Sequence, residues 1–518
     1  MDKEFIIAVD SGTQSIRAIV YDRSGREIAK SQQELEPYFS VNPGWAEQKP
    51  DDYWTNFCRV VKEVMKHKDV DPKKIGGLGI TTQRGGIIPM DKDGTPLRNC
   101  IIWLDQRFTE DPPPVGWKIK ALFTVIGKAE LIKLIQKNSK FTWIYTYEPE
   151  VYKKTKVFGQ ITTFFVKKLT DSFNDCASMY VGYWPLESKK FDWYGIDGIL
   201  DVFCIRRDHL PTLFKPNEVL GHVTKKAAQE TGLPEGLPVV VGAGDKQSES
   251  LGAGAITPDI GTISYGTATT MEVMTNKFIE SNKLNYFTWC SALPDAWCLE
   301  CFIYRGFWMA KWFIQQLGHR EALEAEKQGI APEALLDKVI RDIPPGSMGL
   351  MLQPYWTPHP SQKFSKGSII GFGSVHTRAH IYRSILEGIA YELRRLGELV
   401  QKDTKVPLTE LRVGGGGSRS DMAVQIAADV FNLPAKRMRN FENCAMGAAI
   451  DAAVATGMFS GFDEAVKSMV QTGDTFDPIL ENHKIYDDLF NDVYMKTYGA
   501  LAPLYRRIGD ITGYREGD

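Results

Sequence analysis

The chain has 518 residues, of which 43% are hydrophobic and 24% are charged, and its formal net charge is −2 at pH 7. This length exceeds what a single hydrophobic core holds, so we expect two or more domains. The small net charge excludes a dominant electrostatic site for nucleic acid or for an anionic membrane. No apolar run reaches the roughly 20 residues that span a bilayer.

The N-terminal part predicts a unit of strands and one helix. The run "FIIAVD" is continuously apolar, which is typical of a buried strand and not of a signal peptide. Strands are expected at 5–10, 17–23, 27–35 and 75–83, and a helix at 51–68. The resulting order is β-β-β-α-β.

The second half repeats this theme. Strands are expected on both sides of a turn in 263–275, helices at 379–401 and 445–457, and a strand that ends in "RVGGGG" before a helix near Ser420. Each half places a strand before a Gly-Thr turn, "DSGTQS" at 10–15 and "YGTATT" at 265–270. We therefore expect a duplicated α/β domain with a cleft between the copies, a join near 253, and inserted helices and loops at about 110–235.

The stretch "VDSGTQSIR" has the composition of a phosphate-binding turn. Gly12 lets backbone N–H groups approach an anion, Thr13 and Ser15 offer hydroxyls, and Arg17 offers positive charge. Asp10, at the end of the strand, can hold Mg²⁺ through water. A plain β-hairpin turn has a similar composition, so both interpretations stay open.

An acid follows the apolar run of "LPVVVGAGDKQSES". A carboxylate at the end of a buried strand costs free energy unless it has a role. Asp245 either accepts a proton from a hydroxyl that attacks a γ-phosphate, or it caps the following helix. Later in the chain, the glycine cluster before Ser420 permits close approach of a ring or a ribose, although neither the Walker A pattern nor the dinucleotide fingerprint fits it.

Five segments, in order, resemble the FGGY family of carbohydrate kinases over nearly the whole chain. They are "AVDSGTQSIRAIVYD", "GAGDKQ", "ISYGTATT", "GSIIGFGSVHTRAHIYRSILEGIAYEL" and the segment that begins with "RVGGGGSRSD". The resemblance implies two ribonuclease-H-like domains of the actin and hexokinase type with an interdomain cleft. Residues 1–253 are then the N-terminal FGGY kinase domain on the sugar-binding side, and 254–518 are the C-terminal domain on the adenosine-binding side.

The resemblance also implies ATP and Mg²⁺ as cofactors, and transfer of the γ-phosphoryl group to a sugar or polyol hydroxyl with Asp245 as general base. Asp10 and Asp245 are the expected metal residues. The residues expected at the nucleotide are Asp10, Gly12, Thr13, Ser15, Arg17, Gly266, Thr267, Gly415, Gly416 and Asn443. One departure is that Phe307 stands where family members have a glycine, with Gly306 one position earlier.

The segment at 79–107 is most similar to the substrate segment of glycerol kinases, in which Arg84 and Trp103 match residues that contact glycerol. Gly85 replaces a glutamate of those enzymes and Lys246 replaces a glutamine. We therefore expect glycerol to be a poor acceptor and a polyol or ketose of four to six carbons to be a better one, with glycerol kinase or xylulokinase activity as the alternative. The expected substrate contacts are Gln83, Arg84, Trp103, Asp105, Asp245 and Lys246.

Two alternatives stay open from the sequence. Lys246 either meets a carboxylate or phosphate of the acceptor, or it is a surface salt-bridge lysine. Actin-like and chaperone-like nucleotide switches share the expected fold, although the acceptor segment favours a kinase. The expected partner is a small sugar or polyol, without nucleic acid or membrane, and a homodimer is left open. The eight scattered cysteines predict reduced thiols in the cytoplasm.

Overall fold

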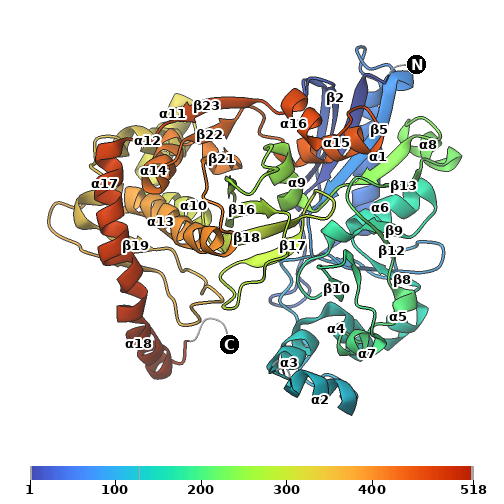
Figure 1. The fold of residues 1–518 in the computed structure, drawn as a ribbon, viewed down its shortest axis with the longest axis horizontal. Coiled ribbons are helices and arrows are strands. Elements are labelled where there is room, and N and C mark those ends of the chain that lie inside the picture. Colours follow the sequence, from blue (N-terminus) through green and yellow to red (C-terminus); the bar gives the residue numbers. More distant parts are fainter. Residues whose placement is uncertain (1–2, 126, 128, 515–518) are drawn as a thin grey trace. The chain divides into compact units, whose positions relative to one another are not determined.

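The computed structural model describes residues 3–125, 127 and 129–514, and the chain divides into two compact units (Figure 1). Unit 1 contains Met1–Gly254, Trp289–Trp297 and Glu442–Val470. Unit 2 contains Ala255–Thr288, Cys298–Phe441 and Gln471–Asp518. The sequence analysis placed all of 254–518 in one domain, whereas Glu442–Val470 packs with the N-terminal part of the chain.

Unit 1 is built on a six-stranded sheet with the strand order β13-β14-β5-β1-β2-β3. Strands β1, β2 and β3 form the predicted antiparallel meander, β5 and β14 follow in parallel, and β13 closes the edge. Side chains of β1 and β5 are buried along nearly their whole length, as their apolar runs predict. The strands are β1 (Phe5–Ser11), β2 (Ser15–Asp22), β3 (Glu27–Glu34), β5 (Ile75–Thr82), β13 (Val219–His222) and β14 (Pro238–Val241).

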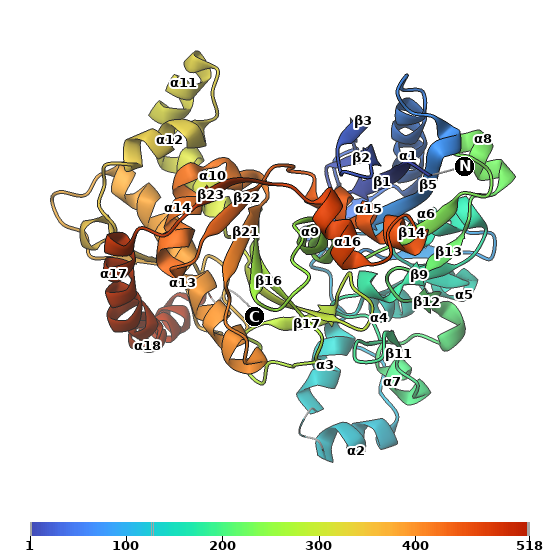
Figure 2. The same cartoon turned by 45° about the horizontal axis from the view of Figure 1, so that its top comes forward.

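Two helices cover this sheet and carry site residues. Helix α1 (Pro50–Met65) buries the apolar side of its predicted pattern against β2 and β3. Helix α15 (Asn443–Ala455) packs against β5, β1 and helix α9 (Asp245–Gly252). Figure 2 shows α15 and α16 (Phe462–Met469) beside the blue N-terminal strands, although they come from the far end of the chain.

Glycines allow α15 to pack this closely. A Cβ atom on Gly79 of β5 would lie 2.0 Å from the Ala448 carbonyl oxygen, and one on Gly447 would lie 1.9 Å from the Ser248 carbonyl oxygen. The absence of a side chain at these glycines therefore lets α15 pack closely against β5 and α9.

The region 110–235 holds most of the remaining elements of unit 1. Its helices are α2 (Trp117–Val125), α3 (Ala129–Asn138), α4 (Lys140–Tyr147), α5 (Pro149–Lys154), α6 (Ile161–Thr170), α7 (Asp197–Val202) and α8 (Lys225–Thr231). Short strand pairs are β4 (Glu47–Gln48) with β7 (Cys100–Ile101), β6 (Ile88–Met90) with β8 (Val157–Gly159), β9 (Asn174–Cys176) with β12 (Thr212–Phe214), and β10 (Leu186–Glu187) with β11 (Asp192–Trp193). The predicted insertion at about 110–235 extends too far, because β13 lies within that range and belongs to the central sheet. With four residues, β13 is too short to show a strand pattern in the sequence.

Unit 2 repeats the topology on a seven-stranded sheet with the order β17-β18-β16-β15-β21-β22-β23. As in unit 1, a central strand pairs antiparallel with its successor and parallel with a later strand, and an antiparallel strand closes the edge. The strands are β15 (Ile260–Tyr265), β16 (Thr269–Thr275), β17 (Phe287–Cys290), β18 (Trp297–Ile303), β21 (Glu410–Gly414), β22 (Ala435–Met438) and β23 (Thr472–Phe476). The predicted duplication is confirmed.

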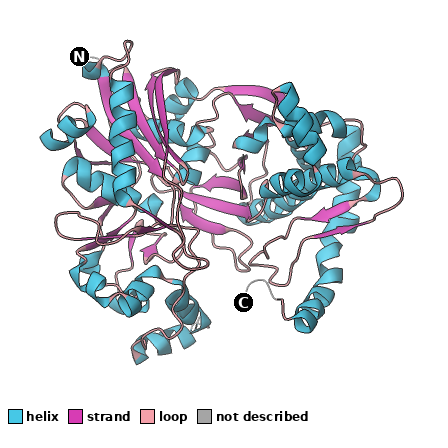
Figure 3. Cartoon of the chain, turned by 180° about the vertical axis from the view of Figure 1, so that it is seen from behind, coloured by secondary structure: helices cyan, strands magenta, loops and turns pink. Residues whose placement is uncertain are grey.

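Helices of unit 2 pack on this sheet, and α13 (Arg378–Thr404) is the long predicted helix (Figure 3). Ser420 caps α14 (Asp421–Phe431), because its hydroxyl accepts the Ala423 N–H at 3.0 Å. The other helices are α10 (Trp308–Leu317), α11 (His319–Gln328), α12 (Pro332–Ile340), α17 (Leu480–Leu489) and α18 (Met495–Thr512), and a small hairpin joins β19 (Met351–Gln353) to β20 (Ser368–Ile370). Within the described residues, none of the helices has the length and apolar character that crossing a membrane requires.

Candidate active site

Three parallel strands of unit 1 deliver the predicted catalytic residues to one edge of the sheet. Ser11 of β1 is in register with Thr82 of β5, and Ile80 of β5 is in register with Val241 of β14. The segments that follow these strands are joined by hydrogen bonds, from Gln83 N–H to the Ser11 carbonyl at 2.8 Å and from the Thr81 hydroxyl to the Ala243 carbonyl at 2.9 Å. The carboxyl ends of parallel strands are the usual place for a ligand site in an α/β fold.

Asp245 is the first residue of α9, and Gly244, not Asp245, is the N-cap residue. Its carboxylate lies 3.1 Å from Arg84 Nε, and about 31% of its side-chain surface is exposed. A Cβ on Gly244 would lie 2.3 Å from the Arg84 side chain, so glycine is what lets Arg84 reach this carboxylate. The structure thus leaves Asp245 paired with a cation and open to solvent in the first turn of the helix.

Asp10 is buried beside this pair. Its pKa is raised to about 6, chiefly by burial, and the negative charge of Asp245 adds to the shift while Arg17 opposes it. Arg17 lies 3.7 Å from Asp10 and 2.5 Å from Glu442, and it donates to the Ser15 hydroxyl at 3.0 Å. The predicted phosphate-binding arginine is therefore already paired. Sequence reasoning missed Glu442, because nothing in its local pattern links it to Arg17.

The turn after β1 joins the predicted phosphate and acceptor residues. Gly12 N–H donates to the Ser15 carbonyl at 3.0 Å and closes the turn. The Thr13 hydroxyl donates to Gln83 Oε1 at 2.8 Å and accepts from Trp103 Nε1 at 3.0 Å. Thr13, predicted at the phosphates, thus contacts Gln83 and Trp103, predicted at the acceptor.

Lys246 forms an ion pair with Glu249 along α9, at 2.8 Å between Nζ and Oε2. Burial alone lowers the pKa of Lys246, but Glu249 and Asp245 raise it further than burial lowers it, so the ammonium stays charged. This favours the salt-bridge interpretation of Lys246, although the pair is partly buried. The i,i+3 spacing on the predicted helix is the signal that points to Glu249.

Asp105 has no exposed side-chain surface and is fully occupied by neighbours. Its carboxylate accepts from Ala46 N–H at 2.8 Å and from Arg107 N–H at 2.9 Å, and it pairs with Lys140 at 3.3 Å. Arg107 in turn lies over the ring of Trp45 at 4.0 Å. The geometry gives Asp105 a structural role under the Trp103 loop instead of the predicted contact with substrate.

The carboxylates fit the expected magnesium ion. Asp10 and Asp245 both contribute negative potential at the end of β1, and burial with the charge of Asp245 raises the pKa of Asp10. Mg²⁺ takes one or two protein carboxylates and completes its shell with water and phosphate oxygens. No cluster of three or more His, Cys, Asp or Glu side chains suited to a metal occurs among the described residues.

In unit 2, the turn after β15 packs against the glycine cluster. Gly415 has φ +77°, and a Cβ there would lie 2.9 Å from Tyr265 N. By contrast, a Cβ on Gly416 would meet nothing within 4 Å, so open space adjoins this turn. A flat ring or a ribose fits such a cradle, as the glycine cluster predicts.

Phe307 bridges these two turns. Its N–H donates to Thr269 Oγ1 at 3.1 Å, and its ring lies 4.6 Å from the Tyr265 ring, centroid to centroid. A Cβ on Gly417 would come within 2.4 Å of the Phe307 ring. Gly306 is needed for packing, because a Cβ there would lie 2.1 Å from Thr269 Oγ1. Phe307 therefore fills space at the position where family members have a glycine.

Asn443 begins α15 in unit 1 and is buried. Its side-chain Nδ2 has no hydrogen-bond partner among the described residues. Gly266, Thr267, Gly415 and Gly416 belong to unit 2. A buried amide donor without a protein partner is consistent with a ligand contact.

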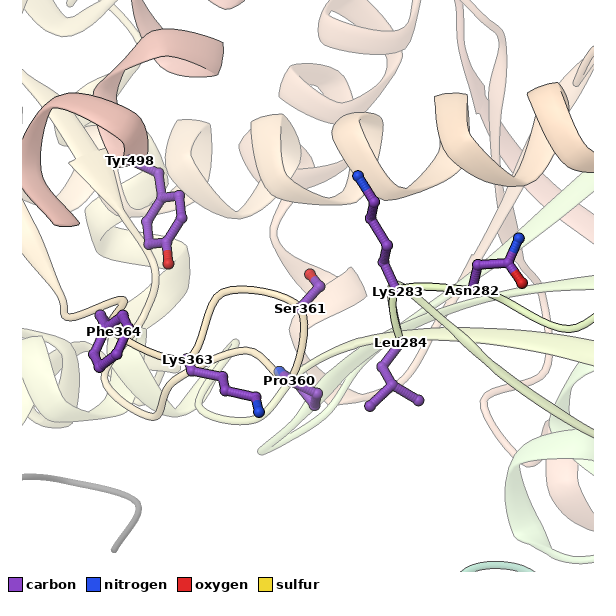
Figure 4. A pocket seen from close by; sticks show the side chains of 8 residues that line it. All are labelled: Asn282, Lys283, Leu284, Pro360, Ser361, Lys363, Phe364 and Tyr498. Atoms are coloured by element: carbon purple, nitrogen blue, oxygen red, sulfur yellow. The ribbon is translucent and has the colours of Figure 1, made fainter. Parts of the chain in front are cut away.

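Two surface pockets have none of the predicted site residues in their lining. One pocket, in unit 1, includes Glu47, Arg98 and Glu148. The other, in unit 2, is formed by two loops and Tyr498 of α18, with Lys283 and Lys363 at its rim (Figure 4). Neither pocket contains the carboxylates or glycine turns described above.

Comparison with known proteins identifies the family. The model of the N-terminal domain of the FGGY family of carbohydrate kinases matches residues 5–252, and the model of its C-terminal domain matches 261–456. An uncharacterized sugar kinase of Escherichia coli K12, YgcE, is 32% identical over 511 residues, which cover 98% of this chain and 96% of that protein. The chain belongs to the FGGY family of carbohydrate kinases. It is therefore a phosphotransferase of an ATP-using family that acts on alcohol groups, and the nucleotide-switch alternative is set aside.

Other FGGY kinases match over most of their length. A xylulose kinase of Staphylococcus epidermidis is 27% identical over 530 residues, covering 99% of this chain and all of that protein. A glycerol kinase of Thermococcus onnurineus is 28% identical over 495 residues, covering 93% and 94%. The crystal structure of xylulose kinase from Rhodospirillum rubrum superimposes with a TM-score of 0.83 at 25% identity, covering 97% of this chain and all of that one. The predicted two-domain α/β fold is confirmed.

Proposed function

We propose that this FGGY kinase transfers the γ-phosphoryl group of MgATP to a hydroxyl of a sugar or polyol, with Asp245 as the general base. The observation that carries the proposal is the Asp245 carboxylate itself. It stands at the carboxyl end of β14, 3.1 Å from Arg84 Nε, and remains partly exposed. A base must be oriented and reachable by the acceptor hydroxyl, and this arrangement supports both requirements.

In the proposed step, Asp245 accepts the proton of the acceptor hydroxyl as the hydroxyl oxygen forms its bond to the γ-phosphorus. The bond from that phosphorus to the bridging oxygen breaks, and ADP leaves with the electron pair. Arg84 orients the carboxylate through Nε and leaves an oxygen of Asp245 for the acceptor. Bound MgATP supplies the phosphoryl group and the cation that neutralises developing charge. We propose that Asp10 and Asp245 hold the metal. The proposed nucleotide residues are Gly12, Thr13, Ser15 and Arg17 with Gly266 and Thr267 at the phosphates, and Gly415, Gly416 and Asn443 at the adenosine.

For the acceptor, we propose contacts to Gln83, Arg84 and Trp103, and a molecule longer than glycerol. Trp103 is half exposed, and the space beside Gly85 is open enough that a Cβ would touch only Trp103, at 3.5 Å. Without the glutamate of glycerol kinases at position 85, a glycerol hydroxyl loses a partner, which costs roughly 1–3 kcal/mol. A ketose or polyol of four to six carbons fills that space and adds hydroxyls.

A substrate panel tests this proposal. Purified enzyme with MgATP is offered glycerol, tetritols, pentitols, ketopentoses including xylulose, and ketohexoses, and ADP release is followed in a coupled assay. We expect kcat/KM for one of the longer acceptors to exceed that for glycerol. A higher value for glycerol than for every longer acceptor would contradict the acceptor proposal, and no acceptor-dependent ADP release from any compound would contradict the kinase assignment of this site.

A further inference from the structure

A closed network of hydrogen bonds ties the phosphate turn to the acceptor segment, and it includes a residue with no assigned role. Tyr53 of α1 is 1% exposed, and its hydroxyl accepts from Gln83 Nε2 at 2.9 Å and donates to Gln48 Oε1 at 2.5 Å. Gln48 Nε2 donates to the Thr13 carbonyl at 2.9 Å, which closes the ring. Thr13, Gln83 and Trp103 complete the network through the bonds of the Thr13 hydroxyl.

The directions of the bonds in this network follow from Gln48. Its Nε2 donates to the backbone carbonyls of Thr13 and Glu36, which can only accept, so its Oε1 accepts from the Tyr53 hydroxyl and, at 3.3 Å, from Gln83 Nε2. Thr13 Oγ1 accepts from the indole N–H of Trp103 and donates its single proton to Gln83 Oε1. Gln83 therefore presents its oxygen to Thr13 and its amide nitrogen to Tyr53. Burial raises the pKa of Tyr53 well above its usual value, so its hydroxyl keeps the proton that it donates to Gln48.

One consequence concerns phosphate binding. While Gln83 is held in this orientation, the Thr13 hydroxyl proton is committed to Gln83 and is not available to a phosphate oxygen. We propose that Tyr53 is a positioning residue: by holding the Gln83 amide, it withholds the Thr13 hydroxyl from the phosphates and makes that hydroxyl responsive to the acceptor at Gln83 and Trp103. This inference rests on the proposed function, because it takes Thr13 as a phosphate contact.

Replacing Tyr53 by Phe removes the nearer of the two acceptors of Gln83 Nε2 and leaves only the 3.3 Å bond to Gln48 Oε1. The amide can then rotate and donate to Thr13 Oγ1, which has two lone pairs, and the Thr13 proton is released toward a phosphate oxygen. We expect Tyr53→Phe to bind the Mg²⁺ complex of β,γ-imido-ATP about five-fold more tightly in the absence of an acceptor, because one additional hydrogen bond forms. Affinity for adenosine, which has no phosphate, should not change.

The experiment is calorimetric titration of the full-length protein with each probe. Gln83→Leu is the second variant: it releases the Thr13 proton directly and should show the same gain for the analogue if Tyr53→Phe folds poorly. Tyr382→Phe is the matched control, because it removes another buried tyrosine hydroxyl, one that has no hydrogen-bond partner among the described residues.

Tighter analogue binding in either variant, with unchanged adenosine binding and an unchanged Tyr382→Phe control, supports the positioning role. Equal changes in affinity for the analogue and for adenosine would reveal a structural effect only and would overturn the positioning role of Tyr53. Folded variants that bind the analogue with wild-type affinity would also overturn it. If the wild-type protein bound adenosine but not the analogue, the proposed function would fail, and the positioning role with it.

Discussion

The two sheets share one topology but differ at the turn after their central strand. In unit 1 the turn spans 12–14 and follows Asp10 and Ser11, whereas in unit 2 it spans 266–268 and follows Ser264 and Tyr265. The first turn is surrounded by charges and a hydrogen-bonded network, and the second by two aromatic rings and glycines. The duplicated fold therefore places different side chains at equivalent turns, and our proposal assigns proton transfer to those of unit 1.

The largest effect should come from replacing Asp245, which lies in unit 1. Asp245→Asn keeps the shape of the side chain but cannot accept a proton, so kcat should fall by ~10²–10⁴. The coupled ADP assay measures it with the best acceptor of the panel. Asp171→Asn, at an exposed carboxylate, is the control. A variant that keeps more than a tenth of wild-type kcat would remove the distinction between the two units.

The two turns themselves can be compared by matched substitutions. Thr13→Val and Thr267→Val each remove a hydroxyl proposed to face charge that grows during transfer, and each should lower kcat by roughly 10²-fold. Thr→Ser variants at both positions keep the hydroxyl and should retain most activity. Steady-state kinetics at saturating MgATP measure both pairs, and unchanged kcat in both valine variants would argue against a phosphate role for the turns.

The acceptor proposal can be sharpened at Gly85. This residue has φ +77°, so any side chain there strains the backbone, and Gly85→Ala must serve as the reference. Relative to Gly85→Ala, Gly85→Glu should shift kcat/KM toward glycerol over a longer acceptor by roughly 1–3 kcal/mol. The same ratio in both variants would show that position 85 does not select the acceptor.

The smallest effect concerns stability. Glu387 and Glu392, buried in unit 2, are paired with arginines, but Asp451, buried in unit 1, has no partner among the described residues. Burial raises the pKa of Asp451 well above its usual value, so the folded state holds a proton that the unfolded state loses. Below the pKa that Asp451 has in the unfolded state, the carboxyl is protonated in both states and the protein has its full stability. The free energy of unfolding then falls as pH rises from that value toward the raised pKa of Asp451 in the folded state.

Asp451→Asn should therefore raise the free energy of unfolding at pH 8 by about 1–3 kcal/mol relative to wild type, with a smaller difference at pH 5.5. Urea unfolding at the two pH values measures it. A wild-type protein more stable than Asp451→Asn at pH 8 would show that the carboxyl has a partner in solution.

Local patterns predicted much of the fold. The apolar run of β1, the spacing in α1 and the start of α14 near Ser420 each depend on neighbours in sequence. The pairing of Glu442 with Arg17 and the burial of Asp105 depend on contacts between distant segments, which no local pattern encodes. For the same reason the packing of Glu442–Val470 with unit 1 was not predicted.

The central claim is that proton transfer depends on Asp245 of unit 1 and that adenosine recognition depends on the glycine turn of unit 2. Calorimetric titration with adenosine, which needs no metal, tests it on two variants. Asp245→Asn should bind like wild type, whereas Gly416→Val, whose Cβ would have no protein atom within 4 Å, should bind about 10-fold more weakly. Gly499→Val, at another open glycine, is the control and should bind like wild type. Normal binding by Gly416→Val together with lost binding by Asp245→Asn would contradict the account.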